Sequence, residues 1–212
     1  MARLTGYGRR VPSVVVIPAT PLLVPGAAGA ADPLAAVREV VREVLRGELP
    51  RSGSGGGARA VVLGTGPAPR AGRLRPSLAA AGIADSVLGL ADDDDEDVAD
   101  AGGDGGDGVA ATGPSVALLA LVGAGIDLAA EPVEVVEVPG DAPAGEVAAV
   151  AGRLRAPSAP GLLVVADHPA PGVDAVLEAL TADGGWEREE HELPQDHGHL
   201  PPSYRITVLR RG

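Results

Sequence analysis

The sequence predicts one α/β domain, a three-layer α/β/α arrangement around a mostly parallel or mixed central sheet. Short runs rich in Val, Leu and Ile alternate along the chain with segments whose apolar residues recur at helical spacing. Several of the short runs are apolar at every position, which is typical of strands that helices cover on both faces. A chain of 212 residues fits a single domain, so residues 1–212 are expected to form one unit.

In the first half of the chain, a strand is expected over Val11–Ile17, where β-branched residues run up to a proline turn. A helix should follow, with Asp32 as its N-cap, Pro33 at its first position and Gly47 at its end. Its apolar face would consist of Leu34, Val37, Val41, Val44 and Leu45. Beyond it the pattern predicts a strand, a turn, a short helix and a third strand, at Ala60–Leu63, Gly64–Pro69, Pro76–Ala81 and Val87–Leu90.

The second half continues the alternation of strands and helices. Apolar runs predict strands at Ser115–Val122, Pro132–Val138 and Gly161–Ala166. Helical spacing predicts helices over Pro143–Arg155 and Val173–Leu180. A last strand over Tyr204–Leu209 alternates apolar and polar residues, so it is expected to be half exposed or at an edge of the sheet.

The net charge of −12 is concentrated in one segment. Nine of the 29 acidic residues lie between positions 92 and 107, and the remaining 20 face 17 arginines. The segment 92–108 contains almost nothing but Asp, Gly and Ala, so it is expected to be a disordered, flexible loop within the domain. The rest of the chain is close to neutral and carries no basic stripe, which argues against a nucleic-acid partner.

Features that bear on localisation favour the cytoplasm. The chain has no Cys, which fits a reducing compartment, and no run of about 18 apolar residues that would span a membrane. An alternative is export, because Arg9-Arg10 precedes an apolar stretch as in a twin-arginine signal. Pro18, Pro21 and Pro25 interrupt that stretch and would break a signal helix, so the cytoplasmic interpretation is preferred.

Four segments occur in the order found in a known family. They are VVVIPATPLLVPG (Val14–Gly26), VEVVEVPGDAPAGEVAAVAGRLRA (Val133–Ala156), GLLVVAD (Gly161–Asp167) and SYRITVL (Ser203–Leu209). Together they resemble the catalytic, LigB-like domain of class III extradiol ring-cleaving dioxygenases. The resemblance is to the short actinobacterial branch of that family, and the richness in Ala, Gly, Arg and Pro suggests a GC-rich coding genome such as that of an actinobacterium.

The resemblance implies an iron site that this chain does not reproduce. The family reaction uses a ferrous ion held by two His and one Glu, with open positions for a catecholate and dioxygen. The first His would fall in the turn that contains Ala19, and the second in the turn Gly64–Pro69, which contains Ala68. Neither turn has an imidazole, so Fe(II) would be the cofactor only if the family activity were retained, and no cofactor is expected.

Asp167 and His168 are the candidate catalytic residues. The resemblance places a catalytic His after the strand Gly161–Ala166, and ligand sites of α/β sheets gather at such strand ends. His168 would then be a remnant of that group, with Asp167 beside it. The alternative is an ordinary Asp-X-Pro turn whose imidazole is solvated, and the sequence leaves both open.

A second cluster of ligating side chains lies near the C-terminus. His197 and His199, with His191 and several neighbouring acidic residues, have the chemistry that binds zinc, iron or nickel. The stretch EEHELPQDHGHLPP has the composition of a loop, so weak adventitious metal binding is the preferred interpretation.

Other functional motifs are incomplete. The loops at Gly64–Pro69 and Gly123–Gly125 do not complete a phosphate-binding glycine pattern, and Gly53-Ser54-Gly55 lacks the strand that a hydrolase nucleophile needs. The leading hypothesis is a dioxygenase-like domain without ring-cleaving activity that binds a small molecule or a partner protein, which could be a second copy of itself. The alternatives are an active metal-dependent oxidoreductase with a site relocated to Asp167, His168 and the C-terminal His cluster, or an interaction module.

Overall fold

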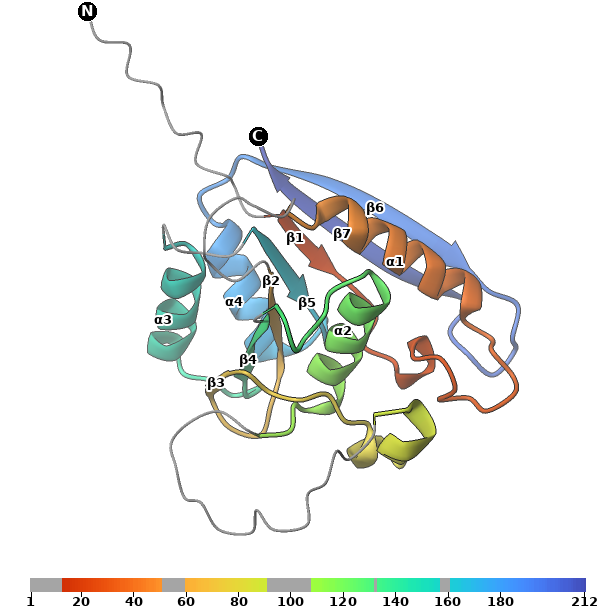
Figure 1. Cartoon of the computed structure of the whole chain (residues 1–212). Coiled ribbons are helices and arrows are strands. Elements are labelled where there is room, and N and C mark those ends of the chain that lie inside the picture. The colour runs from red at the N-terminus through yellow and green to blue at the C-terminus, as the bar shows by residue number, and fades with distance from the viewer. Residues whose placement is uncertain (1–12, 51–59, 91–107, 132, 157–160) are drawn as a thin grey trace, which may run out of the picture.

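A computed structural model describes residues 13–50, 60–90, 108–131, 133–156 and 161–212. They form a seven-stranded mixed sheet with helices on both of its faces, so the predicted α/β class is confirmed (Figure 1). The strands are β1 (Ser13–Val16), β2 (Ala60–Thr65), β3 (Arg70–Gly72), β4 (Val133–Val138), β5 (Leu162–Val165), β6 (Trp186–Pro194) and β7 (Ser203–Arg211). The α-helices are α1 (Ala35–Glu48), α2 (Thr112–Gly123), α3 (Ala144–Leu154) and α4 (Pro171–Thr181). Short 3-10 turns are η1 (Pro21–Leu23), η2 (Ala79–Ala81) and η3 (Asp85–Leu88).

The strand order is β3-β4-β2-β5-β1-β7-β6. The four central strands β4, β2, β5 and β1 run parallel, whereas β3 at one edge and the β7–β6 hairpin at the other are antiparallel to their neighbours. The carboxyl ends of the parallel strands therefore lie together at one end of the strands, which is the carboxyl-terminal edge of the sheet and is distinct from its edge strands. Open α/β sheets bind ligands at such an edge.

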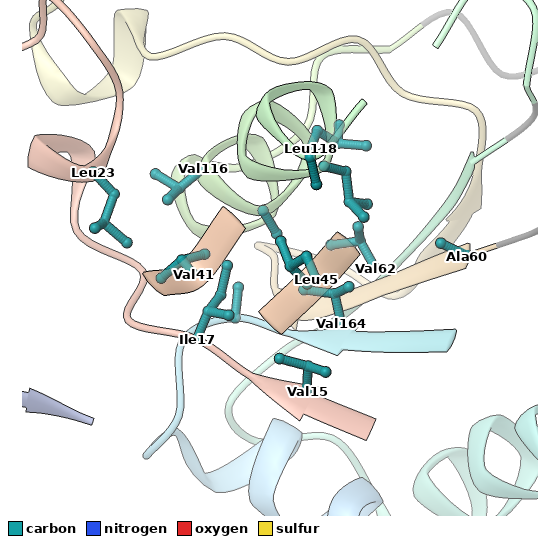
Figure 2. Close-up of a cluster of buried hydrophobic side chains, with 14 of the residues drawn as sticks. Val15, Ile17, Leu23, Val41, Leu45, Ala60, Val62, Val116, Leu118 and Val164 are labelled. Carbon is teal, nitrogen blue, oxygen red and sulfur yellow. The ribbon is translucent and has the colours of Figure 1, made fainter. Parts of the chain in front are cut away.

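Alternate residues of each central strand enter two separate cores. Val15, Val62 and Val164 of the strands pack under α1 and α2. Figure 2 shows them in one cluster with Val41 and Leu45 of α1. Residues of the opposite parity in the same strands pack under α3 and α4. Strands buried on both faces have no polar side to display, which explains why their sequences read as uninterrupted apolar runs.

Helix α1 buries the predicted stripe but begins and ends differently from the prediction. Val37, Val41 and Leu45 are buried at four-residue intervals. The N-cap is Leu34, because the carboxylate of Asp32 pairs with the Arg38 guanidinium instead of capping the helix. The helix also continues through Gly47 to Glu48, so Gly47 is not its end.

Three predicted elements in the middle of the chain have other structures. Ser115–Val122 lies in helix α2, not in a strand. This helix is packed between the sheet, α1 and η1, so it is apolar on nearly every side and its sequence has no helical period to detect. The helix expected over Pro76–Ala81 is only the turn η2, and the strand expected at Val87–Leu90 is replaced by η3.

The two edges of the sheet contain the strands that the sequence did not predict. β3 has only three residues, and β6 is a row of exposed charged side chains without apolar alternation. Charged edge strands of this kind resist pairing with other chains. Because β6 forms the edge, β7 is an inner strand with most of its residues buried, so the prediction that it is half exposed or at an edge was wrong.

Three sequence features lie outside the described residues, one of them Gly53-Ser54-Gly55. The acidic segment 92–108 falls there apart from Gly108, and so does Arg9-Arg10. Within the part of the chain that the structure describes, no helix is both long enough and apolar enough to cross a membrane.

Candidate functional site

The candidate site lies at the carboxyl ends of β2 and β5. Ladder pairing of β5 with β2 continues to Ala166, whose N–H donates to the Leu63 carbonyl over 2.8 Å. The next residue, Asp167, has φ 61° and is the only non-glycine residue with a positive φ among the described residues. Asp tolerates this left-handed conformation better than most residues, yet its backbone costs free energy that surrounding contacts must offset.

Those contacts come from the carboxylate of Asp167, which crosses from β5 to β2 and α2. Its Oδ2 accepts a hydrogen bond of 3.1 Å from the Thr65 N–H, 102 residues earlier in the chain. On its other side it lies directly against Gly113 in the first turn of α2, where any Cβ would overlap it. The positive end of the α2 dipole therefore faces an acidic side chain.

A second carboxylate, Glu137 of β4, also supports the start of α2. Its side chain is fully buried, and Oε1 accepts the Ala111 N–H over 2.7 Å. Oε2 accepts from Arg70 Nε of β3 over 2.6 Å, and Arg70 Nη2 donates in turn to the Val109 carbonyl. A buried carboxylate is stable only when it is paired in this manner, so Glu137 acts as a brace between β3, β4 and α2.

These neighbours shift the acidity of Asp167. Burial raises the pKa of its carboxyl above the ordinary value, the hydrogen bond from the Thr65 N–H opposes the rise, and the negative charge of Glu137 adds to it. A carboxyl group with a raised pKa is a candidate for proton transfer or for hydrogen bonding to a ligand.

The hydroxyl of Thr65 completes this part of the edge. Its Oγ1 is buried and has no hydrogen-bond partner among the described residues. Gly64 and Gly66 flank it and both are needed for close packing, because a Cβ at Gly64 would lie 2.6 Å from the Pro114 ring and one at Gly66 would overlap Glu137. We call Thr65, Gly113, Glu137 and Asp167 the edge site.

His168 follows Asp167 directly but belongs to a different set of contacts. Its Nδ1 lies 2.6 Å from Asp174 Oδ1 in the first turn of α4, and both side chains are substantially exposed, 40% and 37%. Asp174 thus orients the imidazole, while Asp167 is oriented by β2 and α2. Asp167 and His168 are therefore neighbours in the chain, but their side chains have different partners.

The C-terminal histidines lie on and beyond β6. His191 is on the strand, with Nε2 3.3 Å from Glu189, while His197 and His199 are in the β6–β7 connection with ring centroids 6.3 Å apart. Among the residues that the structure describes, no three His, Asp or Glu side chains converge as metal ligands would. The metal site at His197 and His199 stays a prediction.

The residues at which the sequence resemblance would place iron-binding histidines do not fit a ferrous ion. Ala19 is partly buried against the core and Ala68 is exposed in the turn after β2, and neither side chain can coordinate a metal.

Sequence reasoning found Asp167 but missed Glu137, Thr65 and Gly113. The one available signal for Glu137 was its place near the end of a mostly apolar strand, VEVVEV, which also contains Glu134. Its partners Arg70 and Ala111 are 67 and 26 residues away in the chain, so no local pattern connects them. No family model matches the chain, and comparisons with curated proteins and with solved structures find no match.

Proposed function

We propose that this domain binds a small molecule at the edge site and does not cleave aromatic rings with ferrous iron. The observation that carries the proposal is Asp167, a non-glycine residue in a left-handed conformation whose partly exposed carboxylate is tied to β2 and α2. Strained residues of this kind persist where the surrounding structure holds them, and they cluster at ligand sites.

The chemistry of the edge site favours a ligand that donates hydrogen bonds. The Asp167 carboxylate is an acceptor, and the buried Thr65 hydroxyl can donate or accept and has no partner among the described residues. Small-molecule sites typically contain a few polar groups fixed in this way by rigid secondary structure. Polyols and amines have the complementary donors.

The likeness to the dioxygenase family supports the second half of the proposal. If the ordered segments reflect common ancestry, Ala19 and Ala68 mark the loss of both ligand-bearing turns. A facial triad cannot be assembled without its imidazoles.

Binding can be tested by NMR titration of isotope-labelled protein with a panel of small polyols and amines. The proposal predicts saturable shifts at the amides of Thr65, Gly113 and Asp167, weakened by Asp167→Asn. The matched control is Asp174→Asn, which removes the exposed carboxylate beside His168 and should leave those shifts unchanged. Shifts that avoid these amides, or that Asp167→Asn does not alter, would contradict the proposal.

A second candidate function is catalysis by a site relocated to Asp167, His168 and the C-terminal histidines. It is favoured by the Asp174–His168 pair, which orients the imidazole of the residue that follows Asp167 in the chain, and by the pKa of the Asp167 carboxyl, which burial raises. Its test is the pair of variants His168→Ala and His197→Ala. Metal binding or turnover that neither substitution changes would exclude this candidate.

A further inference from the structure

A separate apolar pocket opens between α1, α2, η1 and η3. Its volume is about 190 Å³, and its walls include Leu23, Val41, Leu88, Leu119 and Val122. None of the residues that line it belongs to the edge site. The walls are aliphatic, apart from two arginines of α1.

One of these arginines, Arg42, has unused hydrogen-bond donors at the pocket. Its Nη1 donates to Glu39 over 2.8 Å. Its Nε is buried and has no hydrogen-bond partner among the described residues. Within the same part of the chain, Nη1–Glu39 is the one side-chain hydrogen bond of Arg42, so Nη2 has no partner either. A buried N–H without an acceptor costs free energy, so this edge of the guanidinium requires an explanation.

The other arginine, Arg38, lies one helical turn earlier and provides an internal comparison. Its Nε donates to the Leu23 carbonyl over 2.7 Å, and Nη1 and Nη2 both pair with Asp32. Every nitrogen of Arg38 therefore has an acceptor, whereas the Nε–Nη2 edge of Arg42 has none among the described residues.

We propose that the pocket binds a small aliphatic carboxylate, with its chain among the apolar walls and its carboxylate on the Nε–Nη2 edge of Arg42. The N–H groups on that edge point the same way and match the two oxygens of a carboxylate. An engineered apolar cavity of about 150 Å³ holds one benzene, so this pocket accommodates a chain of roughly six to eight carbons. Glu39 does not compete for that edge, because it is bound to Nη1 and its side chain is 54% exposed, where solvent screens its charge.

The probe is octanoate, measured by isothermal titration calorimetry on the whole chain. The proposal predicts saturable binding with one site per chain, and weaker binding of octan-1-ol and octylamine, which have the same chain without the anion. Arg42→Gln should weaken octanoate binding by about tenfold or more, since charge-assisted hydrogen bonds are lost. Arg46→Gln is the matched control, because Arg46 is exposed on the same helix and does not line the pocket.

A second variant keeps the test independent of any effect of Arg42 on folding. A Cβ at Gly123 would lie 3.6 Å from Arg42 Nε and 3.9 Å from Nη2, which is ordinary contact without overlap. Gly123→Ala should therefore fold as well as the native chain and still weaken octanoate binding by narrowing the approach to that edge. Absence of saturable binding, equal binding of octan-1-ol, or octanoate affinity unchanged in both Arg42→Gln and Gly123→Ala would overturn the proposal.

Discussion

The edge site and the β6–β7 hairpin are both rich in charged side chains, but they use them differently. In the hairpin most pairs are exposed and lie close together in sequence or across the hairpin, as between Arg188 and Glu190, whose side chains are 58% and 40% exposed. The exception is Arg210 of β7, which also pairs with Glu48 of α1. At the edge site Glu137 is buried, and the bonds join residues far apart in the chain. Desolvation and long-range constraint, not the number of charged residues, therefore distinguish a candidate site from a solvated surface.

The two regions should differ most in how much stability the protein loses when one charged side chain is removed. Glu137→Ala leaves the Ala111 N–H and Arg70 without their acceptor, and we expect it to lower the free energy of unfolding by about 3 kcal/mol. Arg188→Gln in the hairpin should change it by less than about 1 kcal/mol. Urea denaturation of both variants measures the contrast, and equal effects would refute it.

A smaller effect is expected from the contact between Asp167 and Gly113. Gly113→Ala introduces a Cβ that overlaps the carboxylate, and we expect a loss of about 1–3 kcal/mol. In a chain that also has Asp167→Gly, the same substitution should be neutral or stabilising, because Ala favours a helix over Gly. A double-mutant cycle measures the coupling between the two positions. Strictly additive effects would show that the two residues do not constrain each other.

The smallest effect is a difference in pH dependence between Asp167 and Asp32. Burial raises the pKa of Asp167, so its ionisation opposes folding, and this cost disappears as the pH falls through the raised pKa. The hydrogen bond from Arg38 lowers the pKa of Asp32, so its stabilising contribution is lost as the pH falls below about 3.9, the ordinary value for Asp.

Denaturation of the native chain, Asp167→Asn and Asp32→Asn between pH 7 and about pH 3 tests this difference. As the pH falls, the native chain should gain stability relative to Asp167→Asn and lose stability relative to Asp32→Asn. If both differences move in the same direction, the assigned environments of these two carboxylates are wrong.

The sequence predicts the centre of this fold better than its margins. Strands such as Leu162–Val165 are buried on both faces, so their apolar runs are unmistakable. The same property misleads at Ser115–Val122, because a helix buried on nearly every side also reads as an apolar run. β6 was missed because an exposed edge strand needs no apolar residues, and its composition resembles a loop.

Only part of the candidate site could be predicted from the sequence, because some of its contacts depend on the buried helix α2. Asp167 could be identified because it directly follows a core strand, where parallel sheets place their ligand sites. Its left-handed backbone and its contact with Gly113 depend on α2, which the sequence assigned to a strand. The histidines drew attention by composition, yet the structure leaves them exposed or only partly buried, without three converging ligands among the described residues.

The central claim, a ligand-binding domain without ferrous ring cleavage, is tested most directly by anaerobic titration of the purified protein with ferrous iron. The loaded protein is then exposed to catechol and air, and ring-opened product is measured. We predict no stoichiometric iron and no ring-opened product, because Ala19 and Ala68 cannot coordinate the metal. One iron bound per chain together with ring-opened catechol would contradict the claim.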